Sequence, residues 1–229
     1  MQKTNPSPCY GLLLAAGFSR RFGADKRLQI LPSRSNSKAT PVGLACLENW
    51  LRACGPSHGL DHLYVVTRPD DDFAKLLTSY LQDPQRLPQR LSQAPCSLLS
   101  AQSAHLGMGH SLASAVSQMP PGALVIGLAD MPYVTSTTIC ALSKQLRDTS
   151  DDAIVQACYR GSPGNPLGFG CAQRDTLMRC QGDQGARSLV RAARDEQSLL
   201  TIEVADAGIL YDIDKPADLA DENSERSTW

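Results

Sequence analysis

The side chains best suited to chemistry follow the first apolar run of this 229-residue chain. Residues 9–16 lead directly into LAAGFSRRFGADKRL (14–28), which gathers glycines, a serine hydroxyl and basic side chains. Glycines let a backbone come close to a ligand, and serine, arginine and lysine donate to phosphate oxygens. Because Gly17 and Gly23 lie six apart, the segment is neither GxxxxGK[ST] nor GxGxxG. It predicts a phosphate-binding loop of another kind; the alternative is a glycine turn with surface basic residues.

Short apolar runs predict the strands that would position this loop. Their apolar character is continuous rather than alternating, which is typical of parallel strands covered on both faces. The runs are 9–16, 62–67, 123–129, 153–159 and 199–204.

Helical spacing between the runs predicts the covering helices. Leu44, Leu47 and Leu51 recur on one face, as do the stripes that begin at Phe73 and Ile139. The aspartates ahead of Phe73 are interpreted as a solvated helix start. Strands that alternate with helices predict a three-layer, Rossmann-like α/β fold with a mostly parallel, mixed sheet. Ligands of such sheets bind at the carboxyl ends of the strands.

Composition excludes several classes of protein. Charged residues make up 20% and the formal charge is −1, which gives no electrostatic footprint for nucleic acid. No apolar stretch is long enough to span a membrane, and no leader precedes the first run, so a cytoplasmic protein is expected. The eight cysteines include no CxxC pair, which disfavours zinc and iron–sulfur sites and predicts buried thiols. Only Cys180, beside a Gly-Asp turn, is a candidate for reactivity.

The chain is expected to form a single domain. Its predicted bounds are a flexible N-terminus (1–8), one domain (9–220) and a disordered tail (221–229). The segment 82–95 is rich in Pro, Gln and Arg and predicts a surface loop.

The loop after the first run closely resembles the signature LAAGxSxRxGxxK of the molybdenum cofactor cytidylyltransferase family, within the MobA-like NTP transferase superfamily. Every fixed position matches. The resemblance implies a nucleotidyltransferase fold in which Arg21 and Lys26 hold a triphosphate. Guanylyltransferase relatives tend to read LAGG here, so Ala16 favours cytidine. The residues implied to line the nucleotide site are Leu14, Ala15, Ala16, Gly17 and Ser19.

Two later segments resemble further parts of the nucleotide site. LGMGHSLASAV (106–116) is similar to the family's GMGxSL loop, which implies that Gly107, Gly109 and Ser111 meet the nucleotide at a helix N-terminus. The alternative is an ordinary serine cap. GLADMPYV (127–134) is similar to LADMP, and an Asp130 at the end of a strand is suited to bind Mg²⁺. Its alternative is a capping aspartate before a proline turn.

Other segments of the resemblance imply a second substrate and further metal ligands. The stretch 159–170 resembles GxxGxPxxF, and 182–190 resembles GDxGAR. The alternative for the latter is a glycine turn with a capping aspartate. YDIDKPADL (211–219) resembles DIDTPEDL, with Lys215 where threonine is usual. Two aspartates there share one face of an extended segment and can support a metal, or cap a helix. The residues concerned are Asn165, Pro166, Asp183, Gly185 and Arg187 for the second substrate, and Asp130, Asp212 and Asp214 for Mg²⁺.

The resemblance implies transfer of CMP from CTP to the terminal phosphate of molybdopterin, the organic part of the molybdenum cofactor. Lys26, Arg21 and Asp130 would be the catalytic residues, with Mg²⁺ as cofactor. The implied partners are CTP and molybdopterin, with a molybdenum hydroxylase or its chaperone as recipient. Two alternatives stay open: a guanylyltransferase or other cofactor nucleotidyltransferase of the same fold, and a non-catalytic molybdenum cofactor insertion chaperone. Neither nucleic acid nor a membrane is an expected partner.

Overall fold

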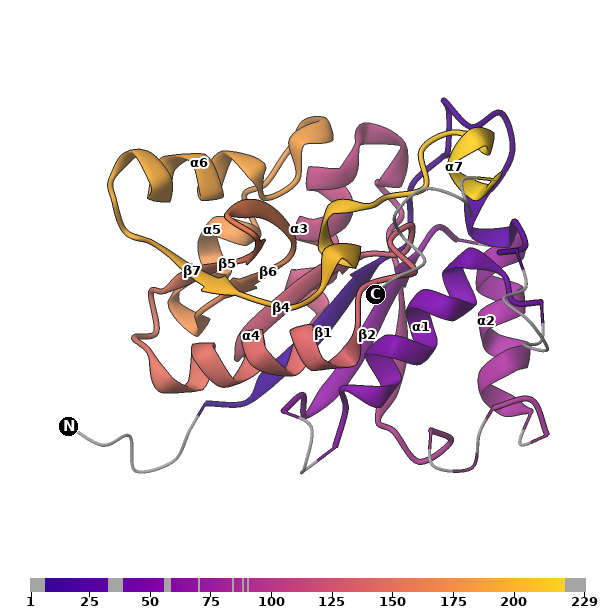
Figure 1. Cartoon of the computed structure of the whole chain (residues 1–229), viewed down its shortest axis with the longest axis horizontal. Helices are drawn as coiled ribbons and strands as arrows, with labels where there is room; N and C mark the ends of the chain where they lie inside the picture. The colour runs from indigo at the N-terminus through magenta and orange to yellow at the C-terminus, as the bar shows by residue number, and fades with distance from the viewer. Residues whose placement is uncertain are drawn as a thin grey trace.

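A seven-stranded mixed sheet, covered by helices on both faces, forms the centre of the computed structural model (Figure 1). The structure describes residues 7–32, 39–55, 59–69, 71–83, 85–87, 89 and 91–220. The strands are β1 (Cys9–Leu14), β2 (His62–Thr67), β3 (Cys96–Ser100), β4 (Ala123–Leu128), β5 (Ile154–Tyr159), β6 (Ser162–Phe169) and β7 (Leu199–Glu203). Their order is β3-β2-β1-β4-β6-β5-β7, and β6 alone runs antiparallel to its neighbours.

Helices cover the sheet in two layers, which confirms the predicted fold class. They are α1 (Val42–Arg52), α2 (Asp72–Gln82), α3 (Met108–Gln118), α4 (Ser136–Asp148), α5 (Arg174–Leu177) and α6 (Arg187–Asp195). A further short helix, α7 (Pro216–Ala220), packs through Leu219 on a small separate cluster with Phe22 and Val42. Adjacent strand residues point to opposite faces. Leu13 therefore packs in the core under α1, α2 and α4, while Leu12 packs in the core under α3, α5 and α6.

The five strands predicted from apolar runs are confirmed, and two further strands escaped prediction. β3 has no fully buried residue, so it carries little apolar signal. The sequence of β6, SPGNPLGF, contains two prolines and two glycines, which are typical of turns. The expectation of burial on both faces is wrong for β7. It pairs only with β5 among the described strands, and Leu200 is 38% exposed.

Two predictions about surface segments are confirmed only in part. The segment 82–95 has no helix or strand of its own beyond the end of α2 among its described residues, but Leu87 and Leu91 enter the core. At the start of α2, Asp71 is not solvated. It accepts a hydrogen bond from the amide of Ala74 at 2.6 Å and pairs with Arg27 and Arg68. Asp72 is exposed and pairs with Lys75 at 3.0 Å, as a solvated helix start predicts.

All eight cysteines are free thiols. Burial raises the pKa of Cys9 to about 11 and those of Cys54 and Cys96 to about 12. Cys180, the candidate for reactivity, is buried as well, and burial raises its pKa. It therefore lacks the thiolate character of a reactive cysteine.

Some predictions concern segments outside the described residues. The expected flexible start falls there except for Ser7 and Pro8, and the expected disordered tail from 221 falls there entirely. No helix in the described part of the chain combines the length and apolar character needed to cross a membrane.

Asp206 ties the segment after β7 to the start of α4. The carboxylate is buried and accepts hydrogen bonds from Thr135 N at 2.9 Å, Thr135 Oγ1 at 2.8 Å, Thr138 Oγ1 at 2.6 Å and Gly208 N at 3.0 Å. We expect Asp206→Asn to lower the free energy of unfolding by about 2 kcal/mol, because the amide presents a donor to groups that already donate. Urea denaturation measures this, with exposed Asp72→Asn as the neutral control. A loss below about 0.5 kcal/mol would contradict this assignment.

Candidate functional site

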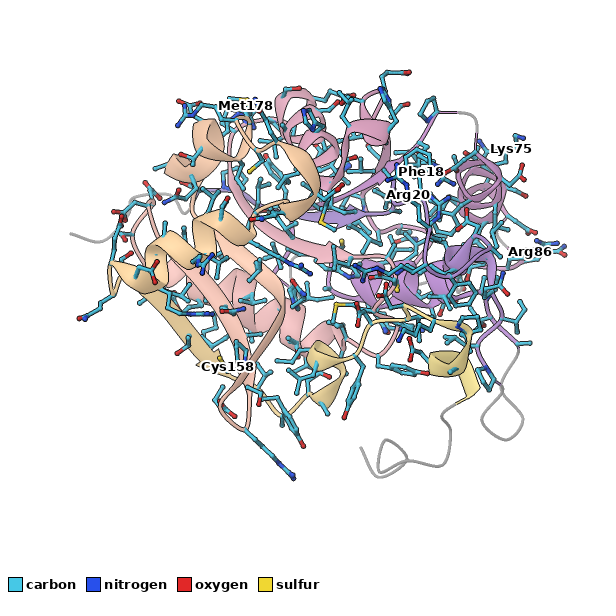
Figure 2. The ribbon with its side chains drawn as sticks, turned by 90° about the horizontal axis from the view of Figure 1, so that it is seen from above. Phe18, Arg20, Lys75, Arg86, Cys158 and Met178 are labelled. Carbon is cyan, nitrogen blue, oxygen red and sulfur yellow. The ribbon has the colours of Figure 1, made fainter. Side chains whose placement is uncertain are left out.

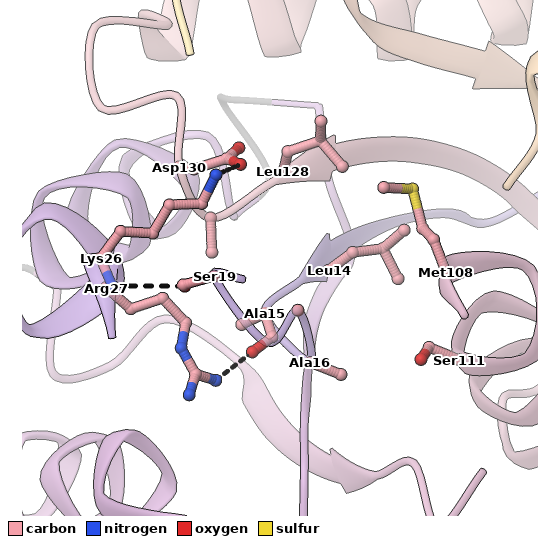
Figure 3. A pocket seen from close by; sticks show the side chains of 12 residues that line it. Leu14, Ala15, Ala16, Ser19, Lys26, Arg27, Met108, Ser111, Leu128 and Asp130 are labelled. Carbon is pink, nitrogen blue, oxygen red and sulfur yellow. Dashed lines mark hydrogen bonds and ion pairs between the residues drawn. The ribbon is translucent and has the colours of Figure 1, made fainter. Parts of the chain in front are cut away.

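The loop after β1 and the end of β4 enclose a pocket at the carboxyl edge of the sheet (Figure 3). It is lined by Leu14, Ala15, Ala16, Gly17, Ser19, Lys26, Arg27, Met108, Ser111, Leu128, Ala129 and Asp130.

Backbone and side-chain hydrogen bonds shape the loop after β1. The amide of Ala15 donates to Val66 O at 2.8 Å, which carries the ladder with β2 one residue beyond the strand. Ser19 then adopts a left-handed conformation with φ of 51°. Its hydroxyl accepts from the amide of Lys26 at 3.3 Å. The loop therefore turns back and brings Lys26 to the pocket.

An ion pair between Lys26 and Asp130 lies in the pocket. Lys26 Nζ is 2.7 Å from Asp130 Oδ2 and 3.4 Å from Asp214 Oδ1, and its side chain is 13% exposed. Burial alone would lower the pKa of Lys26, but the charges of Asp130 and Asp214 outweigh it and raise that pKa. Lys26 is therefore a fixed positive charge at neutral pH.

One carboxylate oxygen of Asp130 accepts no hydrogen bond from the described residues. This atom, Oδ1, is buried. Burial raises the pKa of Asp130, Lys26 opposes that rise and the nearby charge of Asp212 adds to it. A buried carboxylate oxygen without a donor costs free energy. Such an atom is suited to accept a cation or a proton from a ligand.

The segment after the last 3-10 turn reaches this ion pair. The amide of Ile213 donates to Asp130 O at 2.8 Å, which places the predicted metal ligands Asp212 and Asp214 on either side of that contact. Asp212 is exposed, and its charge acts on Asp130. Asp214 is 2.9 Å from exposed Arg21, and the hydrogen bond from Arg21, with help from Lys26, lowers the pKa of Asp214.

The alternative of helix capping by Asp214 is wrong. The carboxylate of Asp218 instead accepts from the amides of Asp214 and Lys215, at 2.8 Å and 2.7 Å. Within the residues that the structure describes, no three His, Cys, Asp or Glu side chains are placed to hold a metal by themselves. A metal at this site would need ligands from a substrate as well.

The start of α3 contributes Ser111 and Met108 to the pocket. Gly107 and Gly109 do not line it; a Cβ at Gly107 would lie 2.5 Å from Gly182 O, and one at Gly109 would lie 2.5 Å from Gln181 O. Both glycines therefore let the loop 181–183 pack against α3. Their contact with a nucleotide stays a prediction.

The predicted second-substrate residues fall into two groups. Asp183 is exposed beside Gly107, and buried Gly185 packs against Met108 at the pocket wall. Arg187 begins α6 and is exposed. Asn165 and Pro166 lie in β6 and do not line the pocket. The structure thus brings the 181–185 loop to the start of α3, next to the pocket.

Four lining residues escaped prediction. Leu128 and Ala129 belong to the segment that resembles LADMP, and Met108 lies inside the GMG segment, so each had a sequence signal. Arg27 had none, because it looks like one more surface cation after Lys26. It is instead 2% exposed.

Several solved structures share this fold. Rv0371c of Mycobacterium tuberculosis H37Rv is 23% identical, with a TM-score of 0.69 over 95% of this chain and 97% of that chain. A complex of Rv0371c with manganese is also known. A nucleotidyl transferase from Methanothermobacter thermautotroptrophicus is 19% identical, with a TM-score of 0.67 over 93% of this chain and 94% of that chain. A CMP:2-keto-3-deoxy-manno-octonic acid synthetase complexed with CTP is 12% identical, with a TM-score of 0.62 over 93% and 96%.

At these identities the structural likeness establishes the fold, and a sequence match establishes the family. Residues 11–198 match the family described as the MobA-like NTP transferase domain. No curated protein matches the chain. The matched range contains the whole pocket, from Leu14 to Asp130. The chain therefore belongs to the MobA-like NTP transferase family and is a nucleotidyltransferase of that type.

Proposed function

We propose that the pocket binds CTP and that the protein transfers CMP to the terminal phosphate of molybdopterin. The products are molybdopterin cytosine dinucleotide and pyrophosphate. The observation that carries the proposal is the buried Lys26–Asp130 pair, in which Asp130 keeps one carboxylate oxygen without a partner. It lies beside the LAAGFS loop in a chain of the MobA-like family.

The residues present fit Mg²⁺ as a cofactor. Magnesium is commonly held by one or two carboxylates together with substrate phosphates and water, so it needs no cluster of three side chains. The free Oδ1 of Asp130 would supply one ligand, and Asp212 or Asp214 would supply a second from the adjoining segment. Bound there with a triphosphate, Mg²⁺ would neutralise phosphate charge.

The chain's own cations act on the phosphates in this proposal. Lys26 and Arg21 are paired with aspartates in the structure, and they exchange those partners for phosphate oxygens when CTP binds. Nucleotidyl transfer needs aligned groups and stabilised negative charge more than it needs a protein nucleophile. Lys26 then donates to the phosphate oxygen whose charge grows as the α–β bond breaks.

The acceptor is proposed to bind beside the start of α3. Arg187 is exposed near the 181–185 loop and presents a guanidinium suited to a phosphate. Asp183 lies next to Gly107, where its carboxylate can accept from the amino groups of a pterin. Asn165 and Pro166 are assigned to the same substrate through the family resemblance alone.

The choice of base is proposed to depend on Ala16, which lines the pocket and is 4% exposed. We expect the wild type to prefer CTP, and Ala16→Gly to shift the CTP:GTP ratio of kcat/KM about tenfold toward GTP, because a methyl group is removed from the pocket wall. Pyrophosphate release with each nucleotide measures this. Ala74→Gly on α2 is the matched control and keeps the wild-type ratio. An unchanged ratio in Ala16→Gly would remove Ala16 from base selection.

A further inference from the structure

Four charged side chains close a ring behind the loop that follows β1. Arg27 Nε donates to Asp25 Oδ1 at 2.8 Å, and Arg27 Nη2 lies 2.8 Å from Asp71 Oδ2. Arg68 completes the ring, with Nε 2.9 Å from Asp71 Oδ2 and Nη2 3.1 Å from Asp25 Oδ2. We call these four residues the charged ring. It joins the loop after β1, the end of β2 and the first turn of α2.

The charged ring is mostly buried. The side chain of Arg27 is 3% exposed, that of Asp71 9% and that of Arg68 17%. The guanidinium of Arg27 also stacks on the Phe73 ring at 4.8 Å. Buried ion pairs stabilise a fold no better than well-packed apolar side chains do. Stability alone therefore does not explain why these four charged side chains are buried together, and we expect a role that depends on their geometry.

The Nη1 atoms of the two arginines in the charged ring make no contact within that ring, and both donate to the pocket loop. Arg27 Nη1 donates to Ala15 O, and Arg68 Nη1 donates to Gly17 O at 2.9 Å. The guanidinium of Arg68 also lies over the aromatic side chain of Phe18, 4.7 Å from the centroid of that side chain. Ala15 and Gly17 both line the pocket. Two peptide groups of this loop are thus held by the arginines of the charged ring. Figure 3 shows the bond from Arg27 to Ala15 O, and Figure 2 labels Phe18, which is 45% exposed.

Fixing the carbonyls also fixes the amides of the same peptide groups. In a trans peptide the N–H points away from the C=O, and both peptides are trans. The amides of Ala16 and Phe18 are therefore directed away from the charged ring. Neither donates to a backbone acceptor in the described part of the chain. The loop presents two oriented donors with no backbone partner beside the pocket.

We propose that Arg27 and Arg68 are positioning residues that hold the amides of Ala16 and Phe18 toward the bound nucleotide. The inference rests on the proposed function, in which this pocket takes a nucleoside triphosphate. A guanidinium suits the task because its planar fork donates to a carboxylate and a carbonyl at once, whereas an ammonium has no fixed fork. Amides that are already oriented before the nucleotide arrives bind it without losing further conformational entropy.

Arg68→Lys is the leading test, because Arg68 is the more exposed arginine of the two. Lysine keeps the positive charge, so attraction of the triphosphate survives while the fork is lost. We expect the Kd for CTP, measured by calorimetry with Mg²⁺ present, to rise about tenfold, as the loss of one or two oriented donors implies. Without nucleotide, hydrogen exchange of a peptide that spans 14–19 should become faster. Arg27→Lys should give the same pair of changes.

Arg147→Lys is the matched control. Arg147 Nη2 donates to Gly59 O at 2.6 Å and pairs with Asp61 at 2.8 Å, so it too binds a loop carbonyl and a carboxylate, but ahead of β2 at the opposite edge of the sheet. It should lower the melting temperature and leave the Kd for CTP within twofold of the wild type.

The outcomes separate the two proposals. If the wild type binds CTP and neither Arg68→Lys nor Arg27→Lys changes the Kd beyond twofold, the positioning role is overturned. An equal rise in Arg147→Lys overturns it as well, because the effect would then be general destabilisation. If the wild type binds neither CTP nor GTP, the proposed function fails. The hydrogen-exchange measurement needs no nucleotide, so it tests the positioning role even in that case. If the exchange rate of the 14–19 peptide is unchanged in Arg68→Lys, Arg68 does not hold the loop.

Discussion

Asp130→Asn should abolish nucleotidyl transfer and leave the fold intact. Asparagine keeps the shape of the side chain but loses the negative charge that faces Lys26 at 2.7 Å and the carboxylate oxygen proposed to bind Mg²⁺. Burial raises the pKa of Asp130, so its charged form costs the fold free energy at neutral pH, and that cost disappears in the variant. We expect kcat to fall at least about 1000-fold, with a melting temperature equal to or above that of the wild type. Pyrophosphate release and thermal unfolding measure the two quantities.

Asp206→Asn is the matched control for this prediction. Both aspartates are largely buried, but the carboxylate of Asp206 accepts four hydrogen bonds, whereas Asp130 has an oxygen with none among the described residues. The control should therefore lose stability and keep its activity per folded molecule. Retained turnover in Asp130→Asn would remove Asp130 from the catalytic site. Equal losses of activity in both variants would mean that the assay reports folding.

Lys26→Met should lower kcat/KM for CTP by about 1000-fold, roughly 4 kcal/mol of transition-state stabilisation. Methionine preserves much of the length of the side chain and removes the charge proposed to reach the phosphates. It also leaves Asp130 without its cation, which should raise the pKa of Asp130 further. Steady-state kinetics with varied CTP separate a change in KM from a change in kcat.

Lys75→Met is the control for this second prediction, because the Lys75 side chain is 69% exposed on α2 and pairs only weakly with exposed Asp72. It should retain wild-type kinetics. A kcat/KM for Lys26→Met within tenfold of the wild type would be incompatible with a phosphate-binding role for Lys26.

The sequence predicts the part of the site that depends on strand ends. Lys26 and Asp130 are distant in sequence, yet both follow parallel strands, β1 and β4, that are neighbours in the sheet. Loops after parallel strands meet at one edge, so the two side chains could be expected together. The other predicted residues that line the pocket also follow parallel strands: Leu14, Ala15, Ala16, Gly17 and Ser19 at the end of β1, and Ser111 after β3.

The rest depends on contacts that a pattern of residue types does not encode. Arg27 is buried because Asp71 and Phe73, at the start of another helix, receive its guanidinium. β6 was missed because its prolines and glycines outweigh its apolar end, although Leu167 and Phe169 are buried there. The different contacts of Asp212 and Asp214 become visible only in the structure. One acts on Asp130 through its charge, and the other binds Arg21 and Lys26.

The most direct test of the account is an assay of the reaction itself. The purified protein is incubated with Mg²⁺, molybdenum-loaded molybdopterin and either CTP or GTP, and both pyrophosphate and the dinucleotide product are followed. The account predicts both products with CTP and a much lower rate with GTP. A product formed only with GTP would contradict the cytidine assignment. Tight binding of the molybdenum cofactor with no product from either nucleotide would contradict catalysis and favour an insertion chaperone.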